Sequence, residues 1–243
     1  MSEAARKTSI DPQEVEQFSR IADEWWDENG KFKPLHRINP LRISYIQSQA
    51  KQHFGREMGG LSLVDIGCGG GLISEPMART GAKVTGVDAS EKNIAVATLH
   101  AQKSALDIRY LATSAEQLAA SGEQFDIVLA LEIIEHVADI DVFYDALVKL
   151  VKPGGLIILS TMNRTPKSYA MAIVGAEYIL RWLPRGTHSW SKFIKPSEMS
   201  RALTTRGLAI RETQGMVFAP LEWKFTLDSK DLDVNYLMVA TKT

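Results

Sequence analysis

The middle of the chain alternates short apolar runs with longer stretches in which apolar residues recur every three or four positions. Short runs bounded by glycine and polar residues predict buried strands, whereas the longer stretches predict amphipathic helices. The predicted strands cover residues 61–66, 83–87, 108–111, 125–131 and 156–161. The predicted helices between them cover residues 72–80, 91–105, 115–121 and 141–150. This alternation indicates βαβ units, and therefore a parallel sheet with helices on both faces.

Helices are also predicted before this alternation, and a mixed tail is predicted after it. Asp11 and Pro12 open a helix in the favoured way, with an acidic cap followed by proline, and Gly30 closes it. The pair Asn39-Pro40 predicts the start of a second helix that ends near Gly55. The tail is predicted to contain a helix at 197–205 and strands at 208–216 and 236–240, with an insertion between the strands.

The length of 243 residues and the 45% share of hydrophobic residues suit one domain with one sizeable core. We expect residues 1–10 to form a disordered tail and residues 11–243 to form a single domain. The expected parts of that domain are N-terminal helices (11–58), a cofactor-binding core (61–161), an inserted lid (162–196) and a C-terminal helix with strands (197–243).

The charge, the cysteine content and the apolar segments of the chain limit its expected partners and its cellular compartment. The net charge of −1 gives no argument for a nucleic-acid partner, and the single cysteine, Cys68, cannot form a disulfide within the chain. No apolar run reaches the length of a membrane span, and the first residues lack the apolar core of a signal peptide. We therefore expect a cytoplasmic protein.

The turn after the first predicted strand carries the clearest chemical information in the chain. It has the pattern Asp-x-Gly-x-Gly-x-Gly, from Asp65 through Gly67 and Gly69 to Gly71, and Asp88 ends the next strand. Glycines in such a turn allow positive φ and let a ligand lie directly on the main chain. An acid at the end of the neighbouring strand can accept hydrogen bonds from ribose hydroxyls. Together these features predict a cofactor that contains a nucleoside.

The same turn argues against a dinucleotide. The dinucleotide pattern needs a glycine at its sixth place, where this chain has Leu72 counted from Gly67, or Ser74 counted from Gly69. The carboxylate of Asp65 would repel a pyrophosphate but would attract a cationic ligand with an ammonium group. A nicotinamide-dependent dehydrogenase is therefore the disfavoured alternative.

The turn resembles motif I of the S-adenosylmethionine-dependent methyltransferases, and longer strings narrow the resemblance. These longer strings are Phe32–Arg42, Glu132–His136, Val174–Leu180, Gly186–His188, Lys192–Pro196 and Asp233–Tyr236. Together they resemble the ubiquinone-biosynthesis O-methyltransferases over nearly the whole chain after Val15. The resemblance implies an α/β, Rossmann-like class I methyltransferase fold. Its sheet would be seven-stranded and mostly parallel, with helices on both faces, an N-terminal helical cap and an inserted helical lid.

The function that the resemblance implies is two S-adenosylmethionine-dependent O-methylations in ubiquinone biosynthesis. The implied acceptors are 2-polyprenyl-6-hydroxyphenol and 3-demethylubiquinol, a phenol and a catechol with a long prenyl tail. A C-methyltransferase of the same pathway is one alternative, and it would not need a metal that chelates a catechol. A non-catalytic S-adenosylmethionine-binding scaffold in a lipid-synthesis complex is another, and it would not need Glu132, Glu135 and His136.

The resemblance also assigns cofactor contacts residue by residue. The contacts carried over by motif are Arg42, Gly67, Asp88 and Leu131. Arg42 would bind the methionine carboxylate, because a guanidinium can bind a planar anion through two hydrogen bonds. Asp65 and Gly69 of the glycine-rich turn are expected to complete this set. Many superfamily members bind the adenine amino group with an acid where this chain has Ser114, so the backbone or Glu116 is expected to serve instead.

The methyl acceptor needs activation, because a phenol with a pKa of ~10 is largely neutral at pH 7. Glu132, Glu135 and His136 follow the fourth core strand and together suit a hard metal ion. The resemblance implies magnesium, which would lower the phenol pKa and orient the acceptor. The same residues also suit the start of a helix, where acids compensate the dipole. Without a metal, His136 is the predicted general base and His188 is the second candidate.

The segment 163–186 combines an apolar, aromatic body with basic ends. The basic residues are Arg164, Lys167, Arg181 and Arg185. This composition predicts a helical lid that covers the substrate cleft and also contacts anionic lipid at a membrane interface. The alternative is a lid helix that only packs on the core. We expect the protein to associate peripherally with the inner membrane, near its lipid substrate. Other enzymes of ubiquinone biosynthesis are further expected partners.

Overall fold

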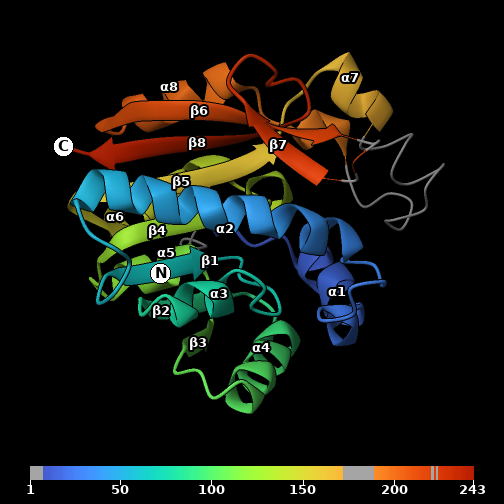
Figure 1. Cartoon of the computed structure of the whole chain (residues 1–243), viewed down its shortest axis with the longest axis vertical. Helices are drawn as coiled ribbons and strands as arrows, with labels where there is room; N and C mark the ends of the chain where they lie inside the picture. The colour runs from blue at the N-terminus through green and yellow to red at the C-terminus, as the bar shows by residue number, and fades with distance from the viewer. Residues whose placement is uncertain (1–7, 172–188, 220–221, 223) are drawn as a thin grey trace, which may run out of the picture.

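The computed structural model describes residues 8–171, 189–219, 222 and 224–243. This part of the chain contains one eight-stranded sheet with the order β3-β2-β1-β4-β5-β8-β6-β7 (Figure 1). Strands β1 to β5 are parallel to one another, whereas β8 is antiparallel to both of its neighbours. The strands are β1 (Ser62–Ile66), β2 (Lys83–Asp88), β3 (Arg109–Ala112), β4 (Phe125–Leu131), β5 (Val151–Met162), β6 (Leu208–Ala219), β7 (Lys224–Asp228) and β8 (Asn235–Lys242).

The predicted alternation of strands and helices is confirmed in the parallel half of the sheet. The helices there are α3 (Ser74–Arg79), α4 (Glu91–Lys103), α5 (Ala115–Ala120) and α6 (Ile140–Leu150). The side chains of Ser90, Ser114 and Asp139 cap the last three of these helices by accepting hydrogen bonds from backbone N–H groups of the first turn. Local capping therefore sets where each of these three helices begins after its strand.

The N-terminal helices differ from the prediction in their bounds. The first predicted helix is split into α1 (Pro12–Arg20) and the short 3-10 helix η1 (Ala22–Glu24). The second, α2 (Lys33–Phe54), begins before Asn39 and contains Pro40 in its interior. Pro34 explains the earlier start, because proline in the first turn of a helix has the required φ and lacks an N–H that would be unpaired there. Gly55, with φ +65°, ends α2 as predicted.

The tail contains one more strand than the predicted seven-stranded sheet. Residues 217–235 were expected to hold only an insertion, but β6 extends to Ala219 and β7 pairs with it in antiparallel register. The remaining described helices are η2 (Ile134–His136), α7 (Pro166–Ser168), η4 (Trp190–Lys192) and α8 (Pro196–Thr204). The fold class is therefore confirmed with an added antiparallel edge strand. None of the described helices is long and apolar enough to cross a bilayer.

The core has two layers because successive strand residues point to opposite faces of the sheet. In β4, Ile127 and Leu129 pack toward α2, which crosses one face of the sheet (Figure 1), whereas Val128 and Ala130 pack toward α6. All four are completely buried. A strand that is buried on both faces has to be apolar at every position, which explains the continuous apolar runs in the sequence.

The strand order reverses between β1 and β4, since β2 and β3 lie on one side of this pair and β5 lies on the other. Loops that leave the carboxyl ends of β1 and β4 diverge at such a point and leave a crevice above the sheet. The N-terminal segment covers this edge. Residues 8–10, which were predicted to belong to a disordered tail, lie at this edge, and Ser9 is buried.

Candidate active site

Two adjoining cavities lie at the carboxyl ends of the parallel strands. The first, of about 120 Å³, is lined by the turns after β1, β2 and β3 and is closed by α1. The second, of about 280 Å³, is mostly apolar and lies between α2 and the β6–β7 hairpin. The residues that line both cavities are Phe18, Trp25, Gly67, Glu132 and His136. A ligand that fills the first cavity would therefore meet a ligand of the second cavity at these residues.

Asp88, at the end of β2, is fixed in the first cavity by three donors. Its Oδ2 atom accepts a hydrogen bond from the Gly69 N–H (3.0 Å), and its Oδ1 atom accepts from the Ser90 N–H (2.8 Å) and from Asn93 Nδ2 (3.2 Å). Burial raises the pKa of Asp88, while the hydrogen bonds from Ser90 and Gly69 oppose the rise. The carboxylate is thus held in one orientation at the wall of the cavity.

The glycines of the turn leave room for a tryptophan as well as for a ligand. A Cβ atom on Gly69 would lie 2.3 Å from Trp25 Cζ2, and one on Gly70 would lie 2.4 Å from Trp25 Cβ. The indole of Trp25 stacks on Phe32 with ring centroids 3.7 Å apart, and its Nε1 donates to Asn93 Oδ1 (2.9 Å). The predicted role of the glycines is therefore incomplete, because they also let the N-terminal segment pack against the turn.

Asp65 lies behind the glycine-rich turn, at the wall of the second cavity. Its Oδ2 atom accepts a hydrogen bond from Ser74 Oγ (2.7 Å). Burial raises the pKa of Asp65 to about 6, the hydrogen bond from Ser74 lowers it, and the negative charge of Asp88 raises it. The carboxylate therefore becomes ionised close to neutral pH, where it favours a cationic ligand.

A buried ion pair joins α2 to the end of β4. Arg42 Nη2 donates to Glu132 Oε1 at 2.6 Å, and Arg42 Nη1 donates to Asn39 Oδ1 at 3.3 Å. The Arg42 Nε atom is buried and has no hydrogen-bond partner among the described residues. Arg42 and Glu132 both line the second cavity. A buried guanidinium with an unused donor favours a further anionic group at this place.

The three predicted metal ligands have different partners, because they point in different directions. The Glu132 carboxylate binds Arg42, whereas Glu135 Oε2 accepts from Thr161 Oγ1 (2.8 Å) on β5. Glu135 Oε1 is buried without a hydrogen-bond partner among the described residues. Burial raises the pKa of Glu135 to about 7, and the negative charge of Glu132 adds to the rise.

His136 is held by the N-terminal helix. Its Nδ1 atom lies 3.0 Å from Glu14 Oε2, and Phe18 of the same helix contacts its ring edge-to-face at 5.1 Å between centroids. Burial lowers the pKa of His136, but its hydrogen bond to Glu14 and the charges of Glu135 and Glu14 outweigh this effect, so the pKa is raised. For Glu14, burial raises the pKa, but hydrogen bonds with His136 and Lys192 lower it to about 2. The pair is therefore ionic below the raised pKa of His136, and above that pKa a neutral imidazole faces the Glu14 carboxylate.

This arrangement does not fit a metal ion at Glu132, Glu135 and His136. The described residues contain no group of three or more histidine, cysteine or acidic side chains that could hold one. Each of the three side chains is instead paired with arginine, threonine or glutamate. Magnesium at these residues stays a prediction, and no step of the chemistry below uses it.

Only some of the other predicted site residues line a cavity. Leu131 lines the second cavity, and Gly69 lines the first. Glu116 is not brought to either cavity wall, because its carboxylate accepts hydrogen bonds from Thr8 Oγ1 (2.7 Å), the Ser9 N–H (2.9 Å) and Ser9 Oγ (2.7 Å). Glu116 thus fastens the N-terminal segment over the first cavity. His188 lies outside the described residues.

Sequence reasoning missed two residues of the site. Glu14 could be identified only as an acid in the first turn of a helix, with no indication that this turn meets His136. Asn235 stands in the string Asp233–Tyr236, which resembles the family, but no role was assigned to it. Both residues contact site residues that are distant in sequence. Glu14 Oε2 lies 3.0 Å from His136 Nδ1, and Asn235 Nδ2 donates to Glu132 Oε2 at 3.1 Å.

The comparisons with known proteins identify the family of the chain. A family profile described as "Methyltransferase domain" matches residues 64–159, which run from Val64 within β1 to Leu159 within β5. A ubiquinone biosynthesis O-methyltransferase of Ruegeria sp. (strain TM1040) is 53% identical over 245 residues, covering 98% of this chain and 99% of the relative. The enzyme of the same description from Cereibacter sphaeroides (strain ATCC 17029 / ATH 2.4.9) is 53% identical over 241 residues, covering 97% and 98%.

Solved structures share the fold at low sequence identity. Magnesium protoporphyrin IX methyltransferase from Synechocystis PCC 6803 with bound SAM aligns with a TM-score of 0.66 and 18% identity, and each chain is covered completely. The plantazolicin methyltransferase BamL, in complex with a desmethyl analogue and SAH, aligns with a TM-score of 0.68 and 16% identity over 95% of this chain and 97% of that one. At this identity the likeness establishes the fold alone.

Replacing Gly69 by alanine should destabilise the protein more than the same change at Gly122. Both residues have positive φ, +53° and +81°, but only the new Cβ at 69 meets another atom, Trp25 Cζ2 at 2.3 Å. Backbone strain should lower the free energy of unfolding by about 1–2 kcal/mol in each variant, and the collision should add about 1–3 kcal/mol in Gly69→Ala. Urea unfolding followed by circular dichroism measures the difference. Equal losses would mean that Trp25 does not pack firmly on the turn.

Proposed function

Because the chain belongs to the ubiquinone biosynthesis O-methyltransferases, we propose that S-adenosylmethionine extends from the first cavity into the second, where a polyprenyl phenol occupies the apolar part. Identity of 52–53% over nearly the full chain shows an S-adenosylmethionine-dependent O-methyltransferase of ubiquinone biosynthesis. The acceptors that we propose are 2-polyprenyl-6-hydroxyphenol and 3-demethylubiquinol.

The observation that supports this placement best is the unused donor of Arg42. A buried donor without a partner costs about 1–3 kcal/mol, and more when it carries charge. The carboxylate of the methionine moiety would remove that cost, and Asp65 lines the same cavity at a place suited to the ammonium group. Asp88 and Gly69 line the first cavity and suit the ribose. When bound, the cofactor supplies a methyl group on a positively charged sulfur.

His136 is the general base in this proposal, because it borders both cavities and is oriented by Glu14. With a proton on Nδ1 donated to Glu14, the lone pair lies on Nε2, and this nitrogen receives the phenol proton. The phenol oxygen would then take up the methyl group that a bound cofactor supplies, with the cofactor sulfur as the leaving group. Holding the reacting atoms in line can contribute up to ~7–11 kcal/mol. Glu132 holds Arg42 at the boundary of the cavities, and a catalytic contact of Glu132 with the phenol stays a prediction.

The second cavity suits the greasy part of the acceptor. Its apolar lining includes Phe32, Leu35, Ile38, Met162 and Phe225. An acceptor whose hydroxyl meets His136 at the boundary could place its prenyl tail along these side chains, where apolar area is removed from water.

We also propose that the segment 163–186 contacts anionic membrane lipid, which would give the enzyme access to its acceptor. Residues 172–188, including Arg181 and Arg185, lie outside the described residues. Just before and after that gap, Tyr169, Met171 and Trp190 are 49%, 42% and 38% exposed. Exposed aromatic and apolar side chains suit a membrane interface. The neighbouring basic residues Arg164 and Lys167 are paired with Glu198 and with Asp231 and Asp233, so the aromatic and apolar side chains carry this proposal. Association with the inner membrane and contact with other biosynthetic enzymes stay predictions.

The ribose assignment predicts a specific loss of cofactor affinity in Asp88→Asn. The substitution keeps the shape but removes the charge that strengthens hydrogen bonds to hydroxyls, so the dissociation constant should rise by about 10- to 100-fold. Asp126→Asn is the matched control, because Asp126 also accepts a backbone N–H, from Ser62 (2.8 Å), but lies at the start of β4. Isothermal calorimetry with S-adenosylmethionine measures both. Unchanged affinity in folded Asp88→Asn would refute the assignment.

The base assignment predicts a change in rate and in its pH dependence. His136→Ala should lower kcat by about 10²- to 10⁴-fold without weakening cofactor binding. Because the pKa of His136 is raised, kcat of the wild type should increase with pH through a midpoint above ~6.5. Glu14→Gln removes the hydrogen-bonded charge that raises this pKa, so the midpoint should fall.

The control for this experiment is Glu16→Gln, since Glu16 lies on the same helix but pairs with Arg20 at the surface. Its pH profile should match that of the wild type. Full activity of His136→Ala would exclude His136 as the base, whereas an unmoved midpoint in Glu14→Gln would mean that Glu14 does not act through His136.

The membrane proposal predicts weaker sedimentation with vesicles of phosphatidylglycerol and phosphatidylcholine for the double variant Tyr169→Ser, Met171→Ser. Binding of the wild type should also weaken as salt rises, because basic residues contribute about 1 kcal/mol each at an anionic surface. Leu99→Ser is the control, as Leu99 is 53% exposed on α4, away from this segment. Equal sedimentation of all three proteins would contradict the proposal.

A further inference from the structure

The reversed strand β8 brings its first residue to the active-site edge of the sheet. The parallel strands end at this edge, whereas the antiparallel strand β8 begins there, and Asn235 pairs in register with Met162 at the end of β5. The Asn235 side chain lines the second cavity, and its Nδ2 donates to Glu132 Oε2 at 3.1 Å. Strand direction thus gives a residue from the end of the chain access to the cofactor-binding loops.

Glu132 depends on such contacts because its backbone is strained. It has φ +52°, a value that non-glycine residues adopt at a cost, and its N–H donates to the Ser160 carbonyl at 2.9 Å. Its Oε1 atom accepts from Arg42 (2.6 Å) and from Ser160 Oγ (2.8 Å), while its Oε2 atom accepts from Asn235. The hydrogen bond from Asn235 therefore fixes the rotation of the carboxylate that faces Arg42.

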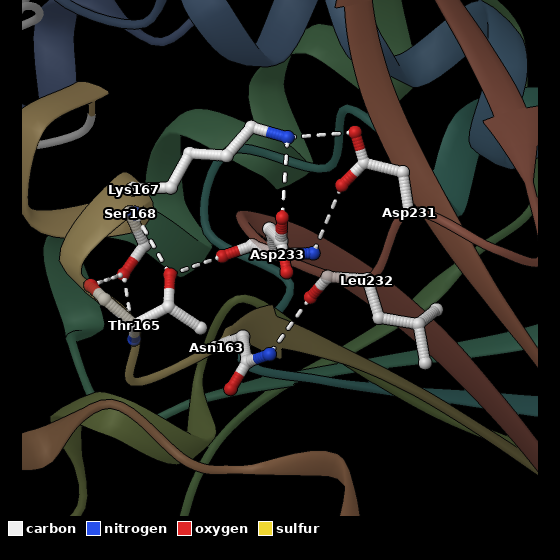
Figure 2. Close-up of polar contacts among 7 residues, drawn as sticks. All are labelled: Asn163, Thr165, Lys167, Ser168, Asp231, Leu232 and Asp233. Atoms are coloured by element: carbon white, nitrogen blue, oxygen red, sulfur yellow. Dashed lines mark hydrogen bonds and ion pairs between the residues drawn. The ribbon is translucent and has the colours of Figure 1, made fainter.

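The loop before Asn235 is clasped by the chain that follows β5, as Figure 2 shows. The Asn163 N–H donates to the Val234 carbonyl at 2.7 Å, and Asn163 Nδ2 donates to the Leu232 carbonyl at 2.8 Å. Thr165 Oγ1 donates to the Asp233 carbonyl at 2.6 Å. Three consecutive carbonyl groups of this loop are thus bound by two residues.

Charge and close packing complete this clasp. Lys167 Nζ lies 2.7 Å from Asp231 Oδ2 and 3.4 Å from Asp233 Oδ2, so one ammonium group spans both carboxylates (Figure 2). The Asp233 N–H donates back to Asp231 Oδ1 at 3.1 Å. On the other side, a Cβ at Gly215 of β6 would lie 1.8 Å from the Asp231 carbonyl oxygen, so the loop lies directly on the β6 backbone. The loop has little freedom to shift.

We propose that Asn235 is a positioning residue of the methyltransferase, and that the clasp formed by Asn163, Thr165 and Lys167 sets its place. Asn235 holds the Glu132 carboxylate, and through it Arg42, in the geometry that receives the methionine end of the cofactor. This inference rests on the proposed role of Arg42. An amide suits this place because it donates to a carboxylate without adding a second negative charge.

The charge at position 235 distinguishes this role from simple strand packing. Asn235→Ala loses one hydrogen bond to a charged group, so the dissociation constant for S-adenosylmethionine should rise about tenfold. Asn235→Asp keeps the shape of the side chain but places two carboxylates in contact, so the constant should rise about 100-fold. A purely structural role predicts the reverse order, because the isosteric aspartate would then be tolerated better than alanine.

Adding Glu132→Gln to Asn235→Asp restores one amide and one carboxylate at this contact. Cofactor affinity in the double variant should return to within about tenfold of the wild type, since the repulsion is removed. Lys167→Met, outside the cavity, should raise the dissociation constant about two- to fivefold. Its control is Lys51→Met, whose exposed ion pair with Glu57 lies near the end of α2, and which should leave affinity unchanged.

Calorimetry with S-adenosylmethionine on the folded variants, together with Arg42→Met, separates the possible failures. Arg42→Met should raise the dissociation constant more than Asn235→Ala does. If Arg42→Met binds like the wild type, the proposed role of Arg42 fails. If Arg42→Met weakens binding but Asn235→Asp binds as well as Asn235→Ala or better, or Glu132→Gln does not restore affinity, the positioning role of Asn235 is overturned.

Discussion

The ion pair between Arg42 and Glu132 connects parts of the chain that are distant in sequence. Arg42 comes from the second N-terminal helix and Glu132 from the end of a central strand, and the pair is largely removed from water. Burial of two charges is costly unless the geometry is good and the remaining polar atoms are satisfied. Ser160 on β5 and Asn235 on β8 meet this demand for the Glu132 carboxylate, whereas Arg42 Nε is left without a hydrogen-bond partner among the described residues. Three strands and one helix must therefore assemble before this charged centre is complete.

The N-terminal segment is part of the site as well as its cover. Ser9 binds Glu116 over the first cavity, Glu14 orients His136, and Trp25 packs on the glycine-rich turn. Lys192 lies 2.9 Å from Glu14 Oε1, so the chain that follows the described gap also contributes to the same group of charges. Cofactor binding and acceptor activation share these contacts, because Phe18 of α1 and Trp25 line both cavities.

The core could be predicted from sequence because its strands are buried on both faces and its helices carry recognisable caps. The glycine-rich turn and Asp88 were placed in the same crevice for the same reason, since parallel strands end at one edge. The pairing of Glu132 with Arg42 and of His136 with Glu14 could not be predicted, because each links residues that approach only through tertiary packing. The extra strand β7 was missed because its residues are largely exposed, and a strand with one solvated side lacks the continuous apolar run used to identify the others.

The two ends of the described chain lie at opposite edges of the sheet, and this affects how the enzyme can be handled. Thr8 and Ser9 are bonded at the mouth of the cofactor cavity, whereas β8 runs away from that edge toward Thr243. An affinity tag or a fluorescent label joined at the carboxyl terminus therefore leaves the reaction centre untouched. The same addition next to Thr8 would disturb the hydrogen bonds of Thr8 and Ser9 to Glu116, which hold the segment over the cavity. Immobilisation for surface-based binding assays should therefore use the carboxyl terminus.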